Sequence, residues 1–128
     1  MAFQVVEGPG IPVSHLPFSP AVRVGDLIFV SGQASVSADG QIIPGTFEEE
    51  MRRSITNVER ILAAAGSGLV DVAHVTSYVR DEGDLAEYNR IYAELFSAPY
   101  PARTTLTGCL PASIRFEIDV IAANEVAR

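Results

Sequence analysis

The stretch TFEEEMRRSITNVERILAAA, residues 46–65, has the clearest helical pattern in the chain. Thr46 followed by Glu49 forms a capping box, in which each side chain can bind the backbone N–H of the other residue. Gly66 follows the stretch, as glycine often follows a helix. One helix face collects the apolar residues Phe47, Met51, Ile55, Val58 and Leu62. The stretch therefore predicts a helix over residues 46–65 with one buried face.

Downstream of this helix, the pattern changes from strand to helix and back to strand. Residues 72–79, VAHVTSYV, are rich in β-branched residues and predict a strand. A second helix is predicted over residues 85–96, with Asp84 as its N-cap. Its apolar stripe is Leu85, Tyr88, Tyr92 and Leu95. Two short strands, 104–107 and 114–122, complete the chain after a proline-rich break.

Upstream, the pattern predicts strands separated by proline-rich loops. A first strand is expected over residues 3–6, and the nearly continuous apolar run DLIFVS, residues 26–31, predicts a strand buried on both faces. The Asp39-Gly40 pair predicts a hairpin turn with strands on either side. We therefore expect one α+β domain over residues 1–128, with a mixed sheet and two helices packed on one face.

Composition limits the kind of protein this can be. With 128 residues and 48% hydrophobic content, the chain has the size of one domain and an apolar share that favours burial between subunits. All nine basic residues are arginines, so enzymes that need a Schiff-base or P-loop lysine are excluded. A net charge of −7 argues against nucleic acid or an anionic membrane as a partner.

Cysteine and histidine are too few for common redox or metal sites. Cys109 is the only cysteine, and His15 and His74 lie far apart, so we expect no disulfide, no metal and no cofactor. Cys109 has no basic neighbour in sequence, so we do not expect it to be a nucleophile. The N-terminal residues do not resemble a signal peptide, and no apolar run could span a bilayer, which predicts a cytoplasmic protein.

The predicted strand 114–122 carries charges on one face only. Because successive side chains of a strand point to opposite faces, one face holds Ile114, Phe116, Ile118, Val120 and Ala122. The other face holds Arg115, Glu117, Asp119 and Ile121. By itself, this pattern is typical of a half-buried strand with a solvated face. On a sheet with helices on one side, the charged side could instead meet another subunit, where charges need partners or a function.

Two other segments could bind a ligand. In PAR, residues 101–103, the proline stiffens the approach to Arg103, whose guanidinium can grip a carboxylate through two parallel hydrogen bonds. In SGQ, residues 31–33, Ser31 offers a hydroxyl and Gly32 lets a ligand approach the backbone closely. Taken singly, the first segment also fits a surface ion pair and the second an ordinary turn.

Together, these segments resemble the RidA (YjgF-type) family of small imine and enamine deaminases, also described as L-PSP endoribonucleases. The resemblance spans most of the chain. It rests on PFSPAV at 17–22, GDLIFVSGQ at 25–33, NVERILAAAG at 57–66, Asp84 to Tyr92, PART at 101–104 and LPASIRFEIDVIA at 110–122. It implies a chorismate-mutase-like α+β fold and a homotrimer with a β-barrel-like core. It also implies active sites in clefts between subunits, without a metal or cofactor.

The resemblance also implies roles for individual residues. Arg103 matches the arginine that binds the substrate carboxylate, and Glu117 matches the acid that positions the hydrolytic water; these are the two expected catalytic residues. The expected substrate-binding residues are Arg103, Thr105, Ser31, Gly32, Phe18 and Asn89. The chain departs from the family pattern at Phe18, where many deaminases have tyrosine, at Thr105, which is often cysteine, and at Pro20, which is commonly glutamine. The segment 103–110 is also about one residue shorter.

These observations leave three functional hypotheses. The first is hydrolysis of reactive 2-imino or enamino acids to 2-keto acids and ammonia. The second is a small-carboxylate-binding protein without strong catalysis, which the departure at Phe18 and the shorter segment favour. The third is ribonuclease activity, against which the acidic charge and the absence of lysine argue.

Overall fold

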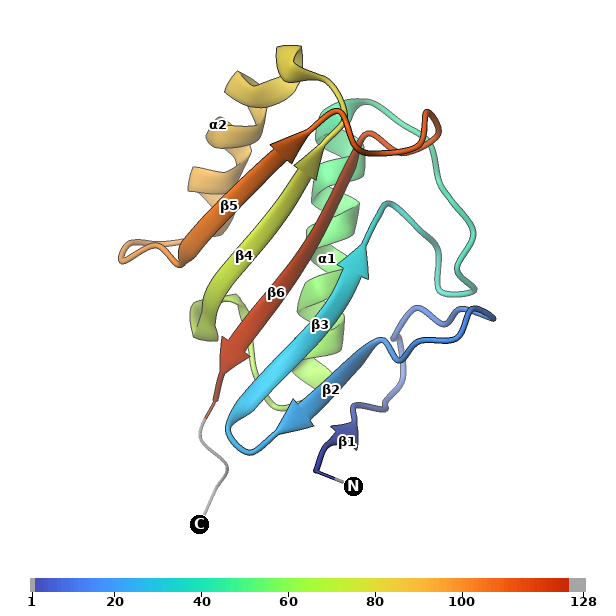
Figure 1. Ribbon diagram of the computed structural model, residues 1–128, viewed down its shortest axis with the longest axis vertical. Helices are drawn as coiled ribbons and strands as arrows, with labels where there is room; N and C mark the ends of the chain where they lie inside the picture. The colour runs from blue at the N-terminus through green and yellow to red at the C-terminus, as the bar shows by residue number, and fades with distance from the viewer. Residues whose placement is uncertain (1, 125–128) are drawn as a thin grey trace.

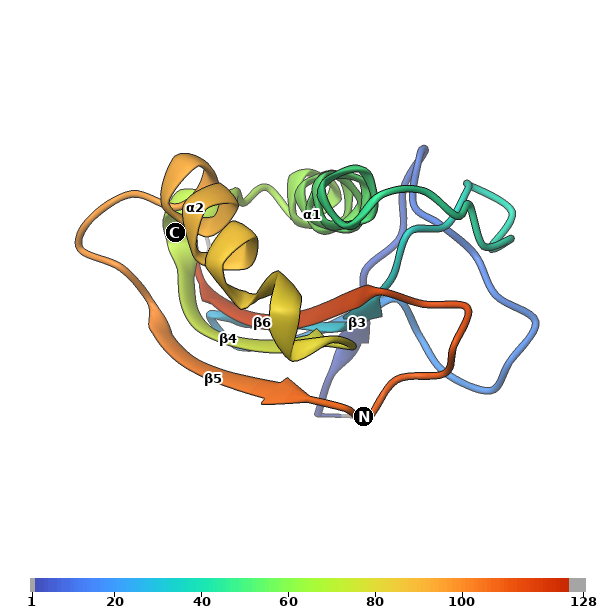
Figure 2. The ribbon, with the colours of Figure 1, turned by 90° about the horizontal axis from the view of Figure 1, so that it is seen from above.

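The computed structural model describes residues 2–124, which form one six-stranded sheet with two α-helices on one face (Figures 1 and 2). The helices are α1 (Phe47–Ala64) and α2 (Leu85–Leu95), and the short 3-10 turns are η1 (Leu69–Asp71) and η2 (Glu82–Asp84). The strands are β1 (Gln4–Val5), β2 (Ala21–Val24), β3 (Leu27–Gln33), β4 (Val72–Val79), β5 (Ala102–Thr107) and β6 (Phe116–Ala123).

The strand order is β1-β2-β3-β6-β4-β5, so the last strand of the chain lies in the middle of the sheet. All neighbouring strands are antiparallel except β4 and β5, which are parallel. A parallel pair needs a long crossover connection, and α2 lies in the segment that provides it. The sheet is therefore mixed, and the predicted α+β fold with two helices on one face is confirmed.

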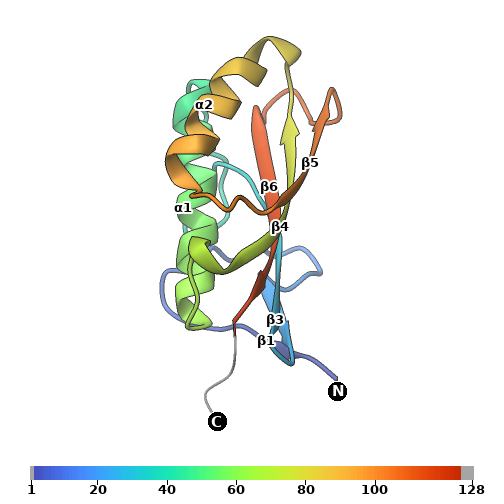
Figure 3. The same ribbon diagram turned by 90° about the vertical axis from the view of Figure 1, so that its left-hand side faces the viewer.

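The hydrophobic core lies between the helices and the sheet (Figure 3). From α1, the predicted apolar stripe is fully buried or nearly so. The predicted capping box is also present: the Glu49 backbone N–H donates to Thr46 Oγ1 at 3.2 Å, and the Thr46 N–H donates to Glu49 Oε1 at 2.9 Å. From the sheet, the core receives Ile28, Val30, Val75, Val79, Phe116, Ile118, Val120 and Ala122.

The face of the sheet away from the helices is called the open face below. On β6 the predicted alternation is confirmed: Phe116 and Ile118 are buried against the helices, whereas Glu117, Asp119 and Ile121 are only half-buried. On β3, the prediction of burial on both faces is wrong for the single chain. Leu27 and Phe29 are 40% and 38% exposed, because no element of the described chain covers them. The open face therefore offers apolar surface.

Three local predictions are corrected. The hairpin around Asp39-Gly40 has no strand pair, only an isolated bridge between Val36 and Ile42. The strand β2 was not predicted, because its four residues follow a proline-rich loop; it pairs with β3 through a turn at Gly25, whose φ is +57°. The Asp84 side chain makes no cap hydrogen bond, because Asp84 ends the 3-10 turn η2.

Within residues 2–124, the structure contains no helix that is both long and apolar enough to cross a bilayer.

Candidate functional site

Glu117 lies on the open face of the central strand β6, next to the end of β3. Within the described chain, no hydrogen bond or ion pair holds its carboxylate. Burial raises the pKa of this carboxyl above its ordinary value, and the nearby charge of Asp119 raises it further. A partly desolvated carboxylate without a partner can accept a proton from a water molecule more readily than a fully solvated one.

Gly32 lies directly against the Glu117 carboxylate. A Cβ atom at position 32 would lie 2.8 Å from Glu117 Oε2, closer than real side chains approach. The preceding residue fixes the neighbouring loop: the Ser31 hydroxyl donates to the Ser19 carbonyl at 2.6 Å. Because Gly32 has no side chain, the Glu117 carboxylate can occupy the space beside it. The hydrogen bond of Ser31 connects β3 to the loop that contains Phe18.

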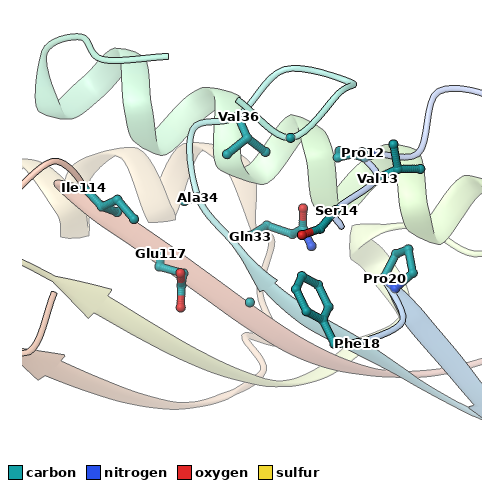
Figure 4. Close-up of a pocket in the computed structure, with 12 residues that line it drawn as sticks. Pro12, Val13, Ser14, Phe18, Pro20, Gln33, Ala34, Val36, Ile114 and Glu117 are labelled. Carbon is teal, nitrogen blue, oxygen red and sulfur yellow. The ribbon is translucent and has the colours of Figure 1, made fainter. Parts of the chain in front are cut away.

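A cavity of about 260 Å³ adjoins Glu117 (Figure 4). Gly32 and Phe18 line it together with Glu117, so the structure brings three of the predicted site residues to one place. Most of the lining is apolar and comes from the loop before β2, the loop after β3 and the residues before β6: Pro12, Val13, Phe18, Pro20, Val36 and Ile114. A small cleft with a few polar groups and one perturbed carboxylate is typical of a ligand site.

Arg103 lies on the edge strand β5, on the side of the helices. Its guanidinium carbon is 5.0 Å and 4.7 Å from the ring centres of Tyr88 and Tyr92 of α2. Within residues 2–124, no carboxylate lies within ion-pair distance of Arg103, in contrast to four other arginines, Arg52, Arg80, Arg90 and Arg115. The tyrosine rings hold the cation by cation–π contacts and leave its N–H groups free for an anion.

The predicted residues Asn89 and Thr105 lie close to Arg103. Asn89 and Arg103 line the same surface hollow, with Tyr92, Tyr100 and Pro101. Thr105 Oγ1 lies 3.0 Å from the Tyr88 hydroxyl, which fixes this part of β5 against α2. The structure thus gathers a second group of predicted residues around Arg103.

Within one chain, these two groups do not meet. Strand β4 lies between β6, which carries Glu117, and β5, which carries Arg103. Glu117 points to the open face, because its neighbours Phe116 and Ile118 are buried against the helices. Arg103 contacts the rings of α2 and therefore lies on the opposite face. The two expected catalytic side chains are thus on opposite sides of the same sheet.

Sequence reasoning did not find some residues that shape these groups. Tyr88 and Tyr92 were interpreted only as an apolar stripe, whereas they also support Arg103. The Tyr78 hydroxyl donates to Asp119 Oδ2 at 2.9 Å, and this hydrogen bond, with burial, raises the pKa of Tyr78 to about 12. Because Tyr78 pairs with Glu117 across the sheet, this contact lies beside the carboxylate. The alternation of β4 could have indicated the face of the sheet on which Tyr78 lies. The sequence does not give the register between β4 and β6, so the position of Tyr78 beside Glu117 could not be predicted.

Neither group of residues has the composition of a metal site. Within residues 2–124, no three side chains of histidine, cysteine, aspartate or glutamate come together as metal ligands. Cys109 is exposed, follows β5 and lines neither the cavity nor the hollow at Arg103. The chemistry available is therefore that of a carboxylate, a guanidinium, hydroxyl groups and backbone groups.

Comparison with known proteins places this chain in one family. Residues 11–124 match the model of the family described as Endoribonuclease L-PSP. A Bos taurus protein described as 2-iminobutanoate/2-iminopropanoate deaminase is 34% identical over 123 residues, which are 94% of this chain and 90% of the relative.

Solved structures have the same fold over nearly their full length. RidA from the Antarctic bacterium Psychrobacter sp. superposes with a TM-score of 0.84 at 28% identity, covering 94% of this chain and 98% of that one. TdcF of E. coli, solved with bound serine, gives a TM-score of 0.81 at 29% identity and covers 95% and 99%.

Proposed function

The chain belongs to the Endoribonuclease L-PSP family, which is the RidA (YjgF-type) family, and from this membership we propose that it hydrolyses 2-imino acids and their enamine tautomers. The products are the corresponding 2-keto acid and ammonia. The Bos taurus relative is named for this reaction on short substrates. The E. coli relative was solved with serine, a small molecule that carries a carboxylate. No metal or cofactor takes part in the proposed reaction.

In the proposed site, Arg103 binds the substrate carboxylate and Glu117 activates water. The imine carbon is already electrophilic, so the protein has only to hold the substrate and move protons. The water oxygen forms a bond to C2 while Glu117 accepts a proton from that water. That proton passes to the imine nitrogen, which gives a carbinolamine with a hydroxyl and an amino group on C2. The hydroxyl proton then passes through Glu117 to the amino nitrogen, the C2–N bond breaks with its electron pair going to nitrogen, and ammonia leaves as the C2 oxygen becomes the keto group. Backbone groups of Thr105 and the side chains of Ser31, Phe18 and Asn89 contact the substrate.

We further propose that the site forms between two copies of the chain in a homotrimer. Arg103 and Glu117 lie on opposite faces of one sheet, so a substrate that touches both must lie between copies. An interface that joins two different patches is head-to-tail, and such contacts close into a ring when the rotation allows it. The exposed side chains Leu27, Phe29 and Leu106 on the strands β3 and β5 provide apolar surface for this contact.

The observation that carries the proposal is a pair of charges that form no ion pair within residues 2–124: the Arg103 guanidinium on its tyrosine rings and the partly buried Glu117 carboxylate. A coupled assay tests it. An amino-acid oxidase generates the imine, and release of the keto acid is measured with and without the protein. We expect faster release with the protein. An unchanged rate for all imines offered would overturn the proposed activity, and a monomer at micromolar concentration in light scattering would overturn the shared site.

A second candidate is binding of small carboxylates without catalysis. Phe18 favours it, because Phe18 lines the cavity beside Glu117 and has no hydroxyl to hold a water. The two candidates differ in the role of Glu117. If the protein only binds, Glu117→Gln leaves every activity unchanged, whereas Arg103→Ala abolishes ligand binding. A cytoplasmic location also remains a prediction.

A further inference from the structure

From the cavity beside Glu117, we infer that the protein acts on 2-imino acids with a large apolar side chain, such as those derived from leucine. This inference rests on the proposed function and names its substrate class. The Bos taurus relative is named for substrates with a methyl or ethyl side chain.

The cavity extends away from Glu117, so it can receive the side chain of a substrate whose C2 atom lies near that carboxylate. Figure 4 shows Glu117 and Ile114 at one end of the lining residues and Pro12, Val13 and Pro20 at the other. C2 of the substrate carries a carboxylate, a nitrogen and a side chain. With the nitrogen beside Glu117, which returns protons to it, and the carboxylate at Arg103 of another copy, one substituent remains. That substituent is the side chain, and the space left for it is the cavity.

The size of the cavity is greater than a short side chain needs. At about 30 Å³ for each water-sized group, a cavity of 260 Å³ holds roughly eight or nine non-hydrogen atoms. The side chain of an alanine-derived imine contributes a single methyl group, which would leave most of this apolar space unfilled. An isobutyl group fills much more of it, and each additional methylene group that it buries favours binding.

The lining is suited to a hydrocarbon rather than to a polar group. Among the described residues that line the cavity, Glu117 is the only charged one. The two uncharged polar side chains each make one hydrogen bond within the chain: the Gln33 amide donates to the Ser31 carbonyl at 3.1 Å, and the Ser14 hydroxyl accepts from the Leu16 N–H at 3.1 Å. Val13 and Phe18 are 57% and 51% exposed in the single chain. An apolar ligand would remove this surface from water.

The test compares two imines on the wild-type protein and on two matched variants. An amino-acid oxidase generates the imine from alanine or from leucine, and kcat/KM is measured for each. Val36 lies in the cavity lining and is half-buried, so Val36→Phe fills the cavity. Val70 lies in η1, is 92% exposed and lines neither the cavity nor the hollow at Arg103, so Val70→Phe is the matched control.

We expect the wild-type protein to prefer the leucine-derived imine by about tenfold or more, since one methylene group in a pocket is worth roughly that factor. Val36→Phe should lower this preference about tenfold, and Val70→Phe should leave it unchanged. A wild-type preference for the alanine-derived imine would overturn the inference and leave the proposed function standing. An equal fall in kcat/KM for both imines in Val36→Phe would also overturn the inference and leave the proposed function standing.

A binding measurement decides the inference if neither imine is hydrolysed, a result that refutes the proposed function itself. Calorimetry then compares 4-methyl-2-oxopentanoate with pyruvate on the wild-type protein. We expect the branched keto acid to bind at least about tenfold tighter, by the same pocket argument. Equal affinities would show that the cavity does not receive the side chain. This measurement needs only the wild-type protein, so it stands even if Val36→Phe does not fold.

Discussion

The surroundings of Glu117 and those of Arg103 differ in how they prepare a charged group. Glu117 is half-buried beside an apolar cavity, and this burial raises the pKa of its carboxyl. Arg103 lies on an edge strand, exposed to solvent and in contact with the faces of two tyrosine rings. The first region thus adjusts proton affinity, whereas the second fixes the position of a cation and leaves its donors free. The comparison suggests that chemistry and anchoring are divided between the two regions.

If Glu117 carries the proton transfer, Glu117→Gln should have the largest effect. The amide keeps the shape of the side chain but cannot accept a proton, so we expect kcat in the imine assay to fall by about 10²–10⁴-fold. Binding of a short keto acid, measured by calorimetry, should persist. A variant with unchanged kcat would show that this region binds rather than catalyses.

If Arg103 is the anchor, Arg103→Ala should lower kcat/KM by roughly 30-fold to several-thousand-fold, because a charge-assisted bidentate contact is lost. Arg103→Lys should not restore the activity, since an ammonium cannot reproduce the planar fork. Calorimetry with a keto acid should show the loss directly. Undiminished binding by Arg103→Ala would contradict the role of anchor.

Mixing the two variants tests whether the regions meet between copies. Each variant has one intact region, so trimers reassembled from equal amounts of Arg103→Ala and Glu117→Gln should regain about a quarter of the wild-type activity. At each interface, the copy that supplies Arg103 has an intact arginine with a chance of one half. The neighbouring copy has an intact Glu117 with the same chance, so one interface in four holds both residues. The rate after joint unfolding and refolding measures it. No recovery, with trimers shown by light scattering, would mean that both side chains of one site come from the same chain.

A smaller effect is expected from Gly32→Ala, which alters only the first region. The added Cβ would meet Glu117 Oε2 at 2.8 Å, so the carboxylate must move. Misplacement of a catalytic group by a fraction of an ångström to one ångström costs up to about 100-fold, and we expect about a tenfold fall in kcat with little change in Tm. Gly83→Ala is the matched control, because a Cβ atom there meets nothing within 4 Å and Gly83 lies in η2, outside the cavity and the hollow at Arg103.

The smallest effect should be on stability, through the raised pKa of Glu117. A carboxyl whose pKa is higher in the folded than in the unfolded protein makes folding less favourable once it is ionised. The free energy of unfolding therefore falls as the pH rises from below the ordinary pKa of glutamate to above the raised pKa of Glu117. We expect Glu117→Gln to have a slightly higher Tm than wild type at neutral pH and no advantage at a pH below that range. Thermal melts at both pH values measure this, and a lower Tm at neutral pH would contradict the assigned burial cost.

The sequence by itself determined the local elements and the residues available for chemistry. The capping box at Thr46 and Glu49, the buried stripe of α1 and the alternation of β6 all depend on residues close in sequence, so periodicity and capping rules predicted them. The resemblance to the RidA family also pointed to Arg103 and Glu117 as candidate catalytic residues, and that role stays a prediction. The same reasoning failed at β2 and around Asp39-Gly40, where short segments depend on which strand comes to lie beside them.

Only the tertiary structure decided how these residues are arranged. The order of the strands puts β4 between Glu117 and Arg103, and the side-chain alternation of each strand then assigns the two residues to opposite faces. The contact between Gly32 and Glu117, the tyrosine rings beneath Arg103 and the cavity beside Glu117 all join segments distant in sequence. Such contacts are fixed by strand order and register, which hydrophobic periodicity does not specify. The placement of Glu117 and Arg103 on opposite faces of the sheet is therefore a property of the fold.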